Sequence, residues 1–369
     1  MLARRITRTP PAGDRRGSCV AEVRLFKFLL SHTYWPFESL SFVFLLSSSH
    51  ERCLRNLSSH DGLQKTWRMV RIMHPGCSQL IFALPAFPRT TAAGDVTPPN
   101  GVDYRLVLDA CHVVTNDASE EPAGYLSEDR EGRDRVPAPS DELAAGEYFY
   151  HPVAPSTTTI PNYPIVTDFA AWKFPDMLPD HWIRHELSPE VIADLRHKYK
   201  GCKARDMRPV VKCSDNGCVI IGGHLSATQV AHLVFPSHAN WFGMNNMWKY
   251  SWAGYGTGIH DPANGLTLRT DFVKSLAKHA FVFFPAGEGG FMTYVCHPSL
   301  TSYLHDLHRR PIAIPHRVSD AFLYARFACT MIALVSRRSK LNAFPLPPGV
   351  PPSRRSALPG RIPRSFRTW

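Results

Sequence analysis

The sequence predicts an α+β protein: a β-rich N-terminal module, then a strand–strand–helix unit with an appended hairpin and helices. Two short apolar runs, Cys218-Val-Ile-Ile and Val230-Ala-His-Leu-Val, are separated by a Gly-Gly pair, which favours two paired strands. The segment after Asn264 has leucines at 266, 268 and 276 and then becomes polar, which predicts a strand end leading into a short helix. Upstream, residues 104–109, 111–114 and 146–151 alternate or run apolar as strands do.

Charge along the chain is positive but unevenly distributed. The 369 residues include 42 Lys and Arg and 31 Asp and Glu, a net charge of +11, which favours nucleic acid as a partner. Residues 76–199 nevertheless carry nine basic and 19 acidic side chains, whereas residues 200–334 carry 13 and seven. The positive excess therefore lies mainly in the two ends, and the centre is only mildly basic.

Residues 1–78 lack the periodicity of a folded domain, and we expect a disordered or wrongly assigned N-terminal extension. The apolar run at 40–46 is too short to cross a bilayer, so no membrane partner is expected. Early arginines, including Arg4 and Arg5, are compatible with a mitochondrial presequence, although Asp14 and two adjacent prolines disfavour one.

Nine cysteines, an odd number, are scattered along the chain, and no apolar signal-peptide core opens it. This pattern predicts an intracellular protein with free thiols. Cys213 and Cys218 have four residues between them and no second pair, which is poor spacing for zinc, so we interpret them as structural thiols.

Residues 79–185 are predicted to form the β-rich module. Between its strands, residues 116–145 are acidic and rich in turn residues. A solvated loop explains the cluster Ser127-Glu-Asp-Arg-Glu better than a metal site, because no histidine lies near it in the sequence.

Residues 186–335 are predicted to form the second domain, which opens on a helix. Ser188 can cap the first amides, Pro189 suits the first helical position, and Glu190 suits the positive helix end. The basic residues that follow, from Lys198 to Arg208, fit a solvated surface somewhat better than a phosphate-binding one.

The centre of this domain resembles the fungal HNH endonuclease-like domain family. The matching phrases are Cys218-Val-Ile-Ile-Gly222, Val230-Ala-His-Leu-Val234, Trp241-Phe242, Asp261-Pro-Ala-Asn-Gly-Leu266, Leu268-Arg269, Phe281-Val-Phe-Phe-Pro285 and Phe322-Leu-Tyr-Ala-Arg-Phe-Ala328. The resemblance covers residues 200–334 well and extends more weakly upstream through residues 146–150. It implies an HNH-like ββα-metal fold that acts on nucleic acid.

The resemblance also implies roles for particular residues. In the HNH arrangement a histidine on the second strand takes the proton of the attacking water, and an asparagine at the loop–helix junction ties the motif together. These positions are His232 and Asn264 here, which we assign to the catalytic motif. On periodicity alone, His232 shares a strand face with Val230 and Val234 and fits a core histidine better than a catalytic one.

The implied divalent metal, Mg, Mn or Zn, has an incomplete set of ligands in the sequence. The helix histidine should fall nine residues after Asn264, but position 273 is valine, and Ala231 directly precedes the base. Valine and alanine have no lone pair to donate to a metal. His260 and Asp261 are the nearest substitute ligands, so we expect a degraded metal site that binds a metal weakly or not at all.

After the motif, the pattern predicts a hairpin over residues 281–285 and 292–296 and an apolar-faced helix that begins near Asp320. Residues 336–369 are basic and rich in Pro and Arg, which predicts a disordered tail. The tail fits a non-specific nucleic-acid contact, a nuclear address or a mere extension.

The sequence thus favours an HNH-type endonuclease-like protein: a metal-dependent phosphodiester hydrolase acting on nucleic acid, or a decayed relative of such an enzyme. The alternative is a catalytically silent nucleic-acid-binding or protein-interaction module that keeps the HNH fold. The spacing of His232 and Asn264 supports the first interpretation, and Val273 supports the second.

Overall fold

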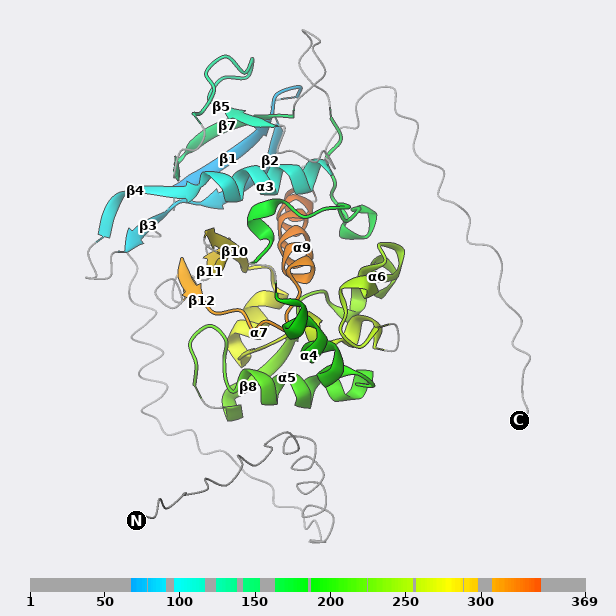
Figure 1. The fold of residues 1–369 in the computed structure, drawn as a ribbon. Coiled ribbons are helices and arrows are strands. Elements are labelled where there is room, and N and C mark those ends of the chain that lie inside the picture. Colours follow the sequence, from blue (N-terminus) through cyan, green and yellow to red (C-terminus); the bar gives the residue numbers. More distant parts are fainter. Residues whose placement is uncertain are drawn as a thin grey trace, which may run out of the picture. The chain divides into compact units, whose positions relative to one another are not determined.

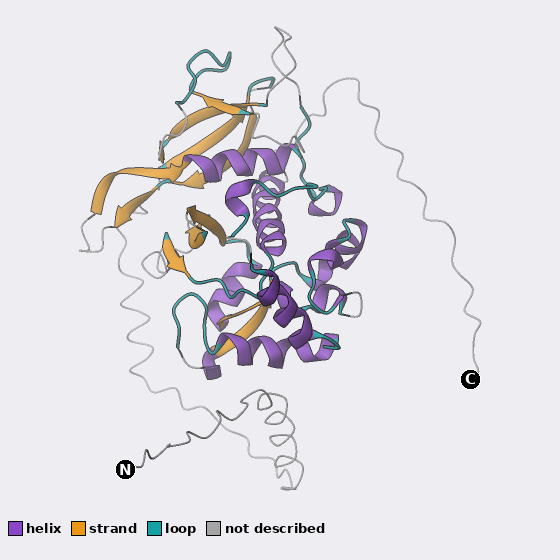
Figure 2. Cartoon of the chain, viewed as in Figure 1, coloured by secondary structure: helices purple, strands orange, loops and turns teal. Residues whose placement is uncertain are grey.

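The computed structural model describes residues 68–77, 79–90, 96–116, 124–137, 142–152, 163–184, 187–223, 225–254, 257–287, 289–297 and 307–339. The chain divides into two units, residues 1–64 and 65–369, and every described residue belongs to the second. It contains both helices and largely antiparallel sheets, so the predicted α+β class is confirmed (Figures 1 and 2). The apolar run at 40–46 and all but four residues of the predicted tail lie outside the described residues.

The first sheet has the order β2-β1-β7-β5. Its strands are β1 (Met69–His74), β2 (Gln79–Pro85), β5 (Tyr125–Ser127) and β7 (Gly146–His151), and β1 runs parallel to β7. The strand predicted over residues 146–151 is therefore confirmed. β1 alternates, with Val70 and Ile72 both 0% exposed, and it lies inside the range where we expected an extension. Folded structure thus begins before residue 79.

The two strands expected over residues 104–109 and 111–114 are wrong, because these residues form one helix, α3 (Tyr104–Thr115). Its buried side chains recur at helical spacing, and they include Leu106, Val107 and Ala110. The Asp103 carboxylate accepts a hydrogen bond from the Leu106 amide at 3.0 Å and so caps the helix. An N-cap followed by apolar residues spaced three and four apart is typical of a helix and not of a strand.

Two further sheets have three strands each. β3 (Phe87–Thr90), β4 (Val96–Asp103) and β6 (Glu142–Ala144) form one, with β4 in the centre. β10 (Phe281–Gly287), β11 (Gly290–Val295) and β12 (Arg310–Ile312) form the other. The antiparallel pairing of β10 with β11 confirms the hairpin predicted after the motif.

Helix α9 (Asp320–Ser339) confirms the helix predicted near Asp320, and it lies at the centre of the fold (Figure 1). It contacts α3, β2 and β10, and all its residues from 321 to 332 are buried. The Trp182 side chain, 0% exposed, packs its indole against the rings of Tyr324, Phe327 and Phe284. The first sheet region and the hairpin thus share one core with α9. None of the described helices combines the length and apolarity that a bilayer span requires.

The part that positions the candidate site is a strand–loop–strand–helix unit. β8 (Thr228–His232) pairs antiparallel with β9 (Gly265–Arg269), and α7 (Thr270–Ala277) follows β9 directly, as the sequence predicts for the segment after Asn264. Helices α4 (Pro189–Tyr199) and α5 (Met207–Asp215) precede it. The predicted start of α4 is confirmed, since the Ser188 hydroxyl accepts from the Val191 amide at 3.4 Å. The loop between β8 and β9 contains α6 (Ala239–Met244) and several short 3₁₀ turns.

Candidate active site

His232 ends β8, where it lies opposite Gly265 of β9. The strand that we expected over residues 218–222 is wrong, because these residues form a turn closed by a hydrogen bond from the Gly222 amide to the Cys218 carbonyl at 2.7 Å. Gly222 has φ of +70°, a conformation that turns the chain away from an extended path. The antiparallel partner of the histidine strand is therefore the strand that follows the loop.

Asn264 is 0% exposed, and its side chain ties together two parts of the loop. Its Oδ1 accepts from the Val234 amide at 2.8 Å, and its Nδ2 donates to the carbonyls of Val234 at 2.9 Å and Ile259 at 2.8 Å. A carboxamide presents a donor and an acceptor in one plane, so it can pair with a backbone as another strand would. These bonds fix the chain directly after His232 against the chain directly before β9.

The His232 and His260 side chains meet, with Nε2 of His232 3.0 Å from Nδ1 of His260. Both side chains are partly buried, and the two rings lie edge to face. Burial, and to a smaller extent the neighbouring charges of His260 and Arg208, together lower the pKa of His232 to about 4. His232 is consequently a neutral imidazole at physiological pH.

A brace from Asn264 and a neutral histidine on a strand–loop–strand–helix unit agree with what the sequence comparison finds. Residues 218–283 match the family of HNH endonucleases. The match runs from the turn before β8, through the loop, β9 and α7, into β10. No curated protein and no solved structure matches the chain. The resemblance seen in the sequence is thereby confirmed for this HNH segment.

Asp261, one of the two substitute ligands expected in the HNH segment, is 0% exposed and holds its own loop together. Its Oδ1 accepts from the amides of Trp252 at 3.2 Å and Ala263 at 2.9 Å. Its Oδ2 accepts from the Ala253 amide and from the Thr257 hydroxyl, each at 2.9 Å. Four hydrogen bonds to the carboxylate account for its burial without a metal.

The helix position of the HNH segment is occupied by Val273, which is partly buried and packs against the hydrophobic core. The acidic neighbour Asp271 is engaged by the guanidinium of Arg269 at 2.7 and 2.8 Å. His279 lies beyond the end of α7, where its Nδ1 faces the Arg326 guanidinium at 3.4 Å. Across the described ranges, no three His, Cys, Asp or Glu side chains converge where they could hold a metal ion. The donor set present does not fit the divalent metal that the family implies.

Two positions outside the HNH segment support it, and the sequence analysis did not assign them a role. Arg317, 2% exposed, donates to the carbonyls of Pro262 at 2.6 Å and Gly265 at 2.7 Å, on either side of Asn264. The same guanidinium bonds the carboxylate of Asp215, which also accepts from the Thr267 amide at 2.7 Å. This ion pair is buried and fixes α5 and the loop to β9. No local pattern in the sequence predicts this ion pair, because 102 positions separate Asp215 from Arg317.

Proposed function

We propose that this protein is an HNH-type endonuclease-like protein that hydrolyses phosphodiester bonds in nucleic acid, with His232 as the proton acceptor. The observation that carries the proposal is the neutral His232 ring, held by His260 beside the Asn264 brace within a segment that matches HNH endonucleases. Here the oxygen of a water attacks phosphorus while His232 takes its proton. The bond from phosphorus to the leaving oxygen then breaks, and that oxygen is protonated by solvent.

The hydrogen bond between the two rings decides which nitrogen can act. A bond between neutral imidazoles needs one N–H donor and one lone pair. If His232 donates from Nε2 to Nδ1 of His260, the lone pair on Nδ1 of His232 stays available to accept a proton. The opposite tautomer would leave His232 without a free lone pair. We assign His260 as the positioning residue that selects the competent tautomer.

The residues at the metal-ligand positions differ from those of the family. Hydrolysis by HNH proteins is assisted by one divalent ion, yet Val273 replaces a ligand and the Asp261 carboxylate is already satisfied by the loop. The described residues offer His232 and His260, and these bond to one another. The described residues thus supply no ligand set for an assisting metal, and we expect hydrolysis to be slow.

The incomplete set of metal ligands favours a second candidate function, a module that binds without hydrolysis. A nucleic-acid-binding or protein-interaction module with an HNH fold needs the Asn264 and Arg317 contacts, which hold the loop, but no metal ligands. Nicking of supercoiled plasmid in Mg²⁺, Mn²⁺ or Zn²⁺ separates the two. Nicking by the wild type that disappears in His232→Ala supports hydrolysis. Binding without nicking in any of these metals supports the module.

A further inference from the structure

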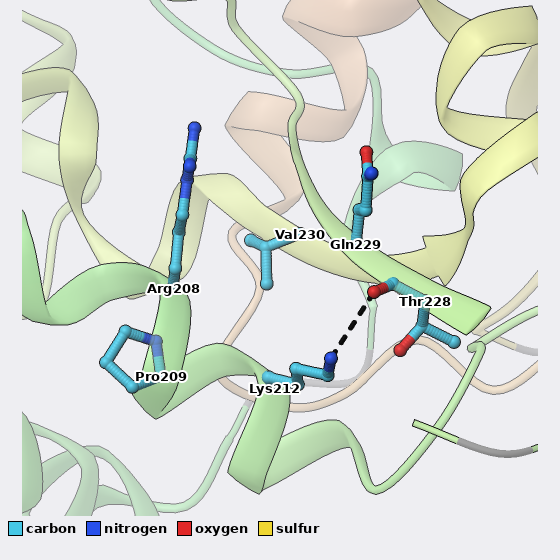
Figure 3. Close-up of a pocket in the computed structure, with 6 residues that line it drawn as sticks. All are labelled: Arg208, Pro209, Lys212, Thr228, Gln229 and Val230. Atoms are coloured by element: carbon cyan, nitrogen blue, oxygen red, sulfur yellow. Dashed lines mark hydrogen bonds between the residues drawn. The ribbon is translucent and has the colours of Figure 1, made fainter. Parts of the chain in front are cut away.

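A cavity of about 360 Å³ lies between α5 and β8, the first strand of the HNH segment (Figure 3). It is lined by Arg208, Pro209 and Lys212 from α5 and by Thr228, Gln229 and Val230 from β8. Two of these six residues carry positive charge, and none is acidic. Figure 3 shows Arg208 and Gln229 extending from the two elements on either side of Val230. The cavity therefore presents cations and an amide, which are groups that bind an anion.

The helix that carries the two cations has a fixed position because α5 is anchored to the sheet. Gly265 of β9 packs so closely under α5 that a Cβ atom there would lie 2.5 Å from the Met207 side chain. At the other end of the helix, Asp215 accepts from the Thr267 amide at 2.7 Å and pairs with buried Arg317. Residues 208 and 212 are four apart, so their side chains share one face of α5.

Within the described part of the chain, the Arg208 side chain makes no hydrogen bond and no ion pair, and the residue is exposed. Lys212 donates only a long bond of 3.4 Å from Nζ to the Thr228 carbonyl. The two acids closest to these cations in the sequence are engaged by other groups: Asp206 accepts from the Lys203 amide at 3.2 Å, and Asp215 pairs with Arg317. Among the residues that the structure describes, no acid forms an ion pair with either cation of the cavity wall.

The cavity is lined by β8, the strand that carries His232. Val230 lines it and precedes His232 by two positions, so the two side chains lie on the same face of β8. Arg208 also contributes to the lowered pKa of His232, which places its charge within electrostatic reach of that ring. An anion bound by Arg208 would accordingly lie beside His232.

We propose that this cavity binds a phosphate of the nucleic-acid backbone through Arg208 and Lys212, and so places the phosphodiester beside His232. This inference rests on the proposed function, since it names how the same site takes its substrate. Both cations come from a helix outside residues 218–283, so the match to HNH endonucleases does not include them. They supply positive charge at a site whose metal ligands are incomplete.

Binding of a fluorescent duplex of random sequence to the full-length chain, measured by anisotropy over a range of salt, tests the site. Each phosphate neutralised contributes about −0.9 to the slope of log affinity against log salt. We expect Arg208→Gln/Lys212→Gln to reduce the magnitude of this slope by about 1, the contribution of the one phosphate that both side chains bind, and Arg208→Gln alone to reduce it by part of that amount. The matched control is Arg105→Gln/Arg133→Gln, which removes the same charge from exposed positions away from the cavity and should leave the slope unchanged.

Equal slopes for the wild type, the cavity variants and the control would overturn the phosphate site, whatever the plasmid assay shows. A slope lost equally in the control would overturn it too, because the contribution would then be net charge alone. A selective loss in the cavity variants supports the site even if the wild type nicks no plasmid, in which case only the hydrolysis fails. Should the double variant not fold, Arg208→Gln decides, because that side chain has no bond to lose.

Discussion

Nε2 of His232 lies 3.0 Å from Nδ1 of His260, although 28 positions separate the two residues. The loop between them is shaped by contacts of other groups. Asn264 bonds the backbone at both Val234 and Ile259, and the second of these directly precedes His260. One carboxamide therefore fixes the positions of both histidines, which gives Asn264 a physical reason to occupy its place in the motif.

Removing that carboxamide should cost stability. Asn264→Ala leaves the amide and carbonyl of Val234 and the carbonyl of Ile259 buried without their partner. Because each unsatisfied buried group costs about 1–3 kcal/mol and three are left, we expect a loss of at least about 3 kcal/mol in the free energy of unfolding. Urea denaturation measures it. The exposed Asn240→Ala is the control, expected within about 0.5 kcal/mol of the wild type, and equal losses in both variants would contradict the brace.

The buried pair of Asp215 and Arg317 should behave as one unit. Arg317→Met removes two bonds to loop carbonyls and leaves the Asp215 carboxylate unpaired, so we expect a loss of about 3–5 kcal/mol. Adding Asp215→Asn to this variant removes the stranded charge, and the double variant should lose less than the sum of the two single variants. Denaturation of the three variants tests the coupling. Strictly additive losses would show that the two side chains do not depend on one another.

Acid should destabilise the protein through His232. The pKa of this ring is about 4 in the folded chain, below its ordinary value of 6.5, so the unfolded chain binds more protons between these pH values. Stability is therefore fully present above pH 6.5 and falls as the pH drops toward 4. At pH 4.5 the shift corresponds to about 2–3 kcal/mol.

His232→Gln isolates that contribution, because glutamine does not titrate. Between pH 7 and pH 4.5, the variant should lose about 2–3 kcal/mol less than the wild type in urea denaturation. Parallel losses in the two proteins would show that the His232 ring is not the group responsible. Any hydrolysis should also persist above pH 5, because His232 is neutral there and can accept a proton.

Metal binding provides a further test. Val273 lacks a lone pair and Asp261 has four donors from its own loop, so we expect no tight, stoichiometric binding of Mg²⁺ or Zn²⁺ in calorimetry. The control is His260→Ala, which should give the same weak heats as the wild type. One-to-one binding that is tight in the wild type and lost in His260→Ala would mean that the loop rearranges to form a metal site.

The sequence predicted the residues of the site better than their surroundings. The separation of His232 and Asn264, and the strand and short helix after Asn264, followed from the residue pattern and the HNH resemblance. The partner strand was mistaken because Cys218-Val-Ile-Ile is apolar enough for a strand, and only the positive φ of Gly222 shows the turn. In residues 104–114, strand and helix interpretations both fit short apolar runs, and the Asp103 cap was overlooked.

The long-range contacts had no signal in the sequence. The sequence places His260 at the site as a candidate metal ligand, but it does not show that His260 contacts the His232 ring, because the intervening loop is irregular and held by tertiary bonds. Arg317 and Asp215 lie far apart in the chain and meet only when α5 docks on β9. In the sequence, the basic residues near Arg208 fit a solvated surface better than a phosphate-binding one, and only the fold shows that Arg208 lines a cavity beside β8.

The most direct test is whether nicking depends on the His232 ring as a base, and not on an effect of His232 on folding. The assay compares supercoiled plasmid with the wild type, with His232→Ala, and with His232→Ala plus free imidazole, after circular dichroism has shown equal folding. We predict slow nicking by the wild type, none by the variant, and partial recovery with imidazole, because the free base can fill the space that the side chain leaves. Equal nicking by wild type and His232→Ala would contradict the assignment of His232 as the base.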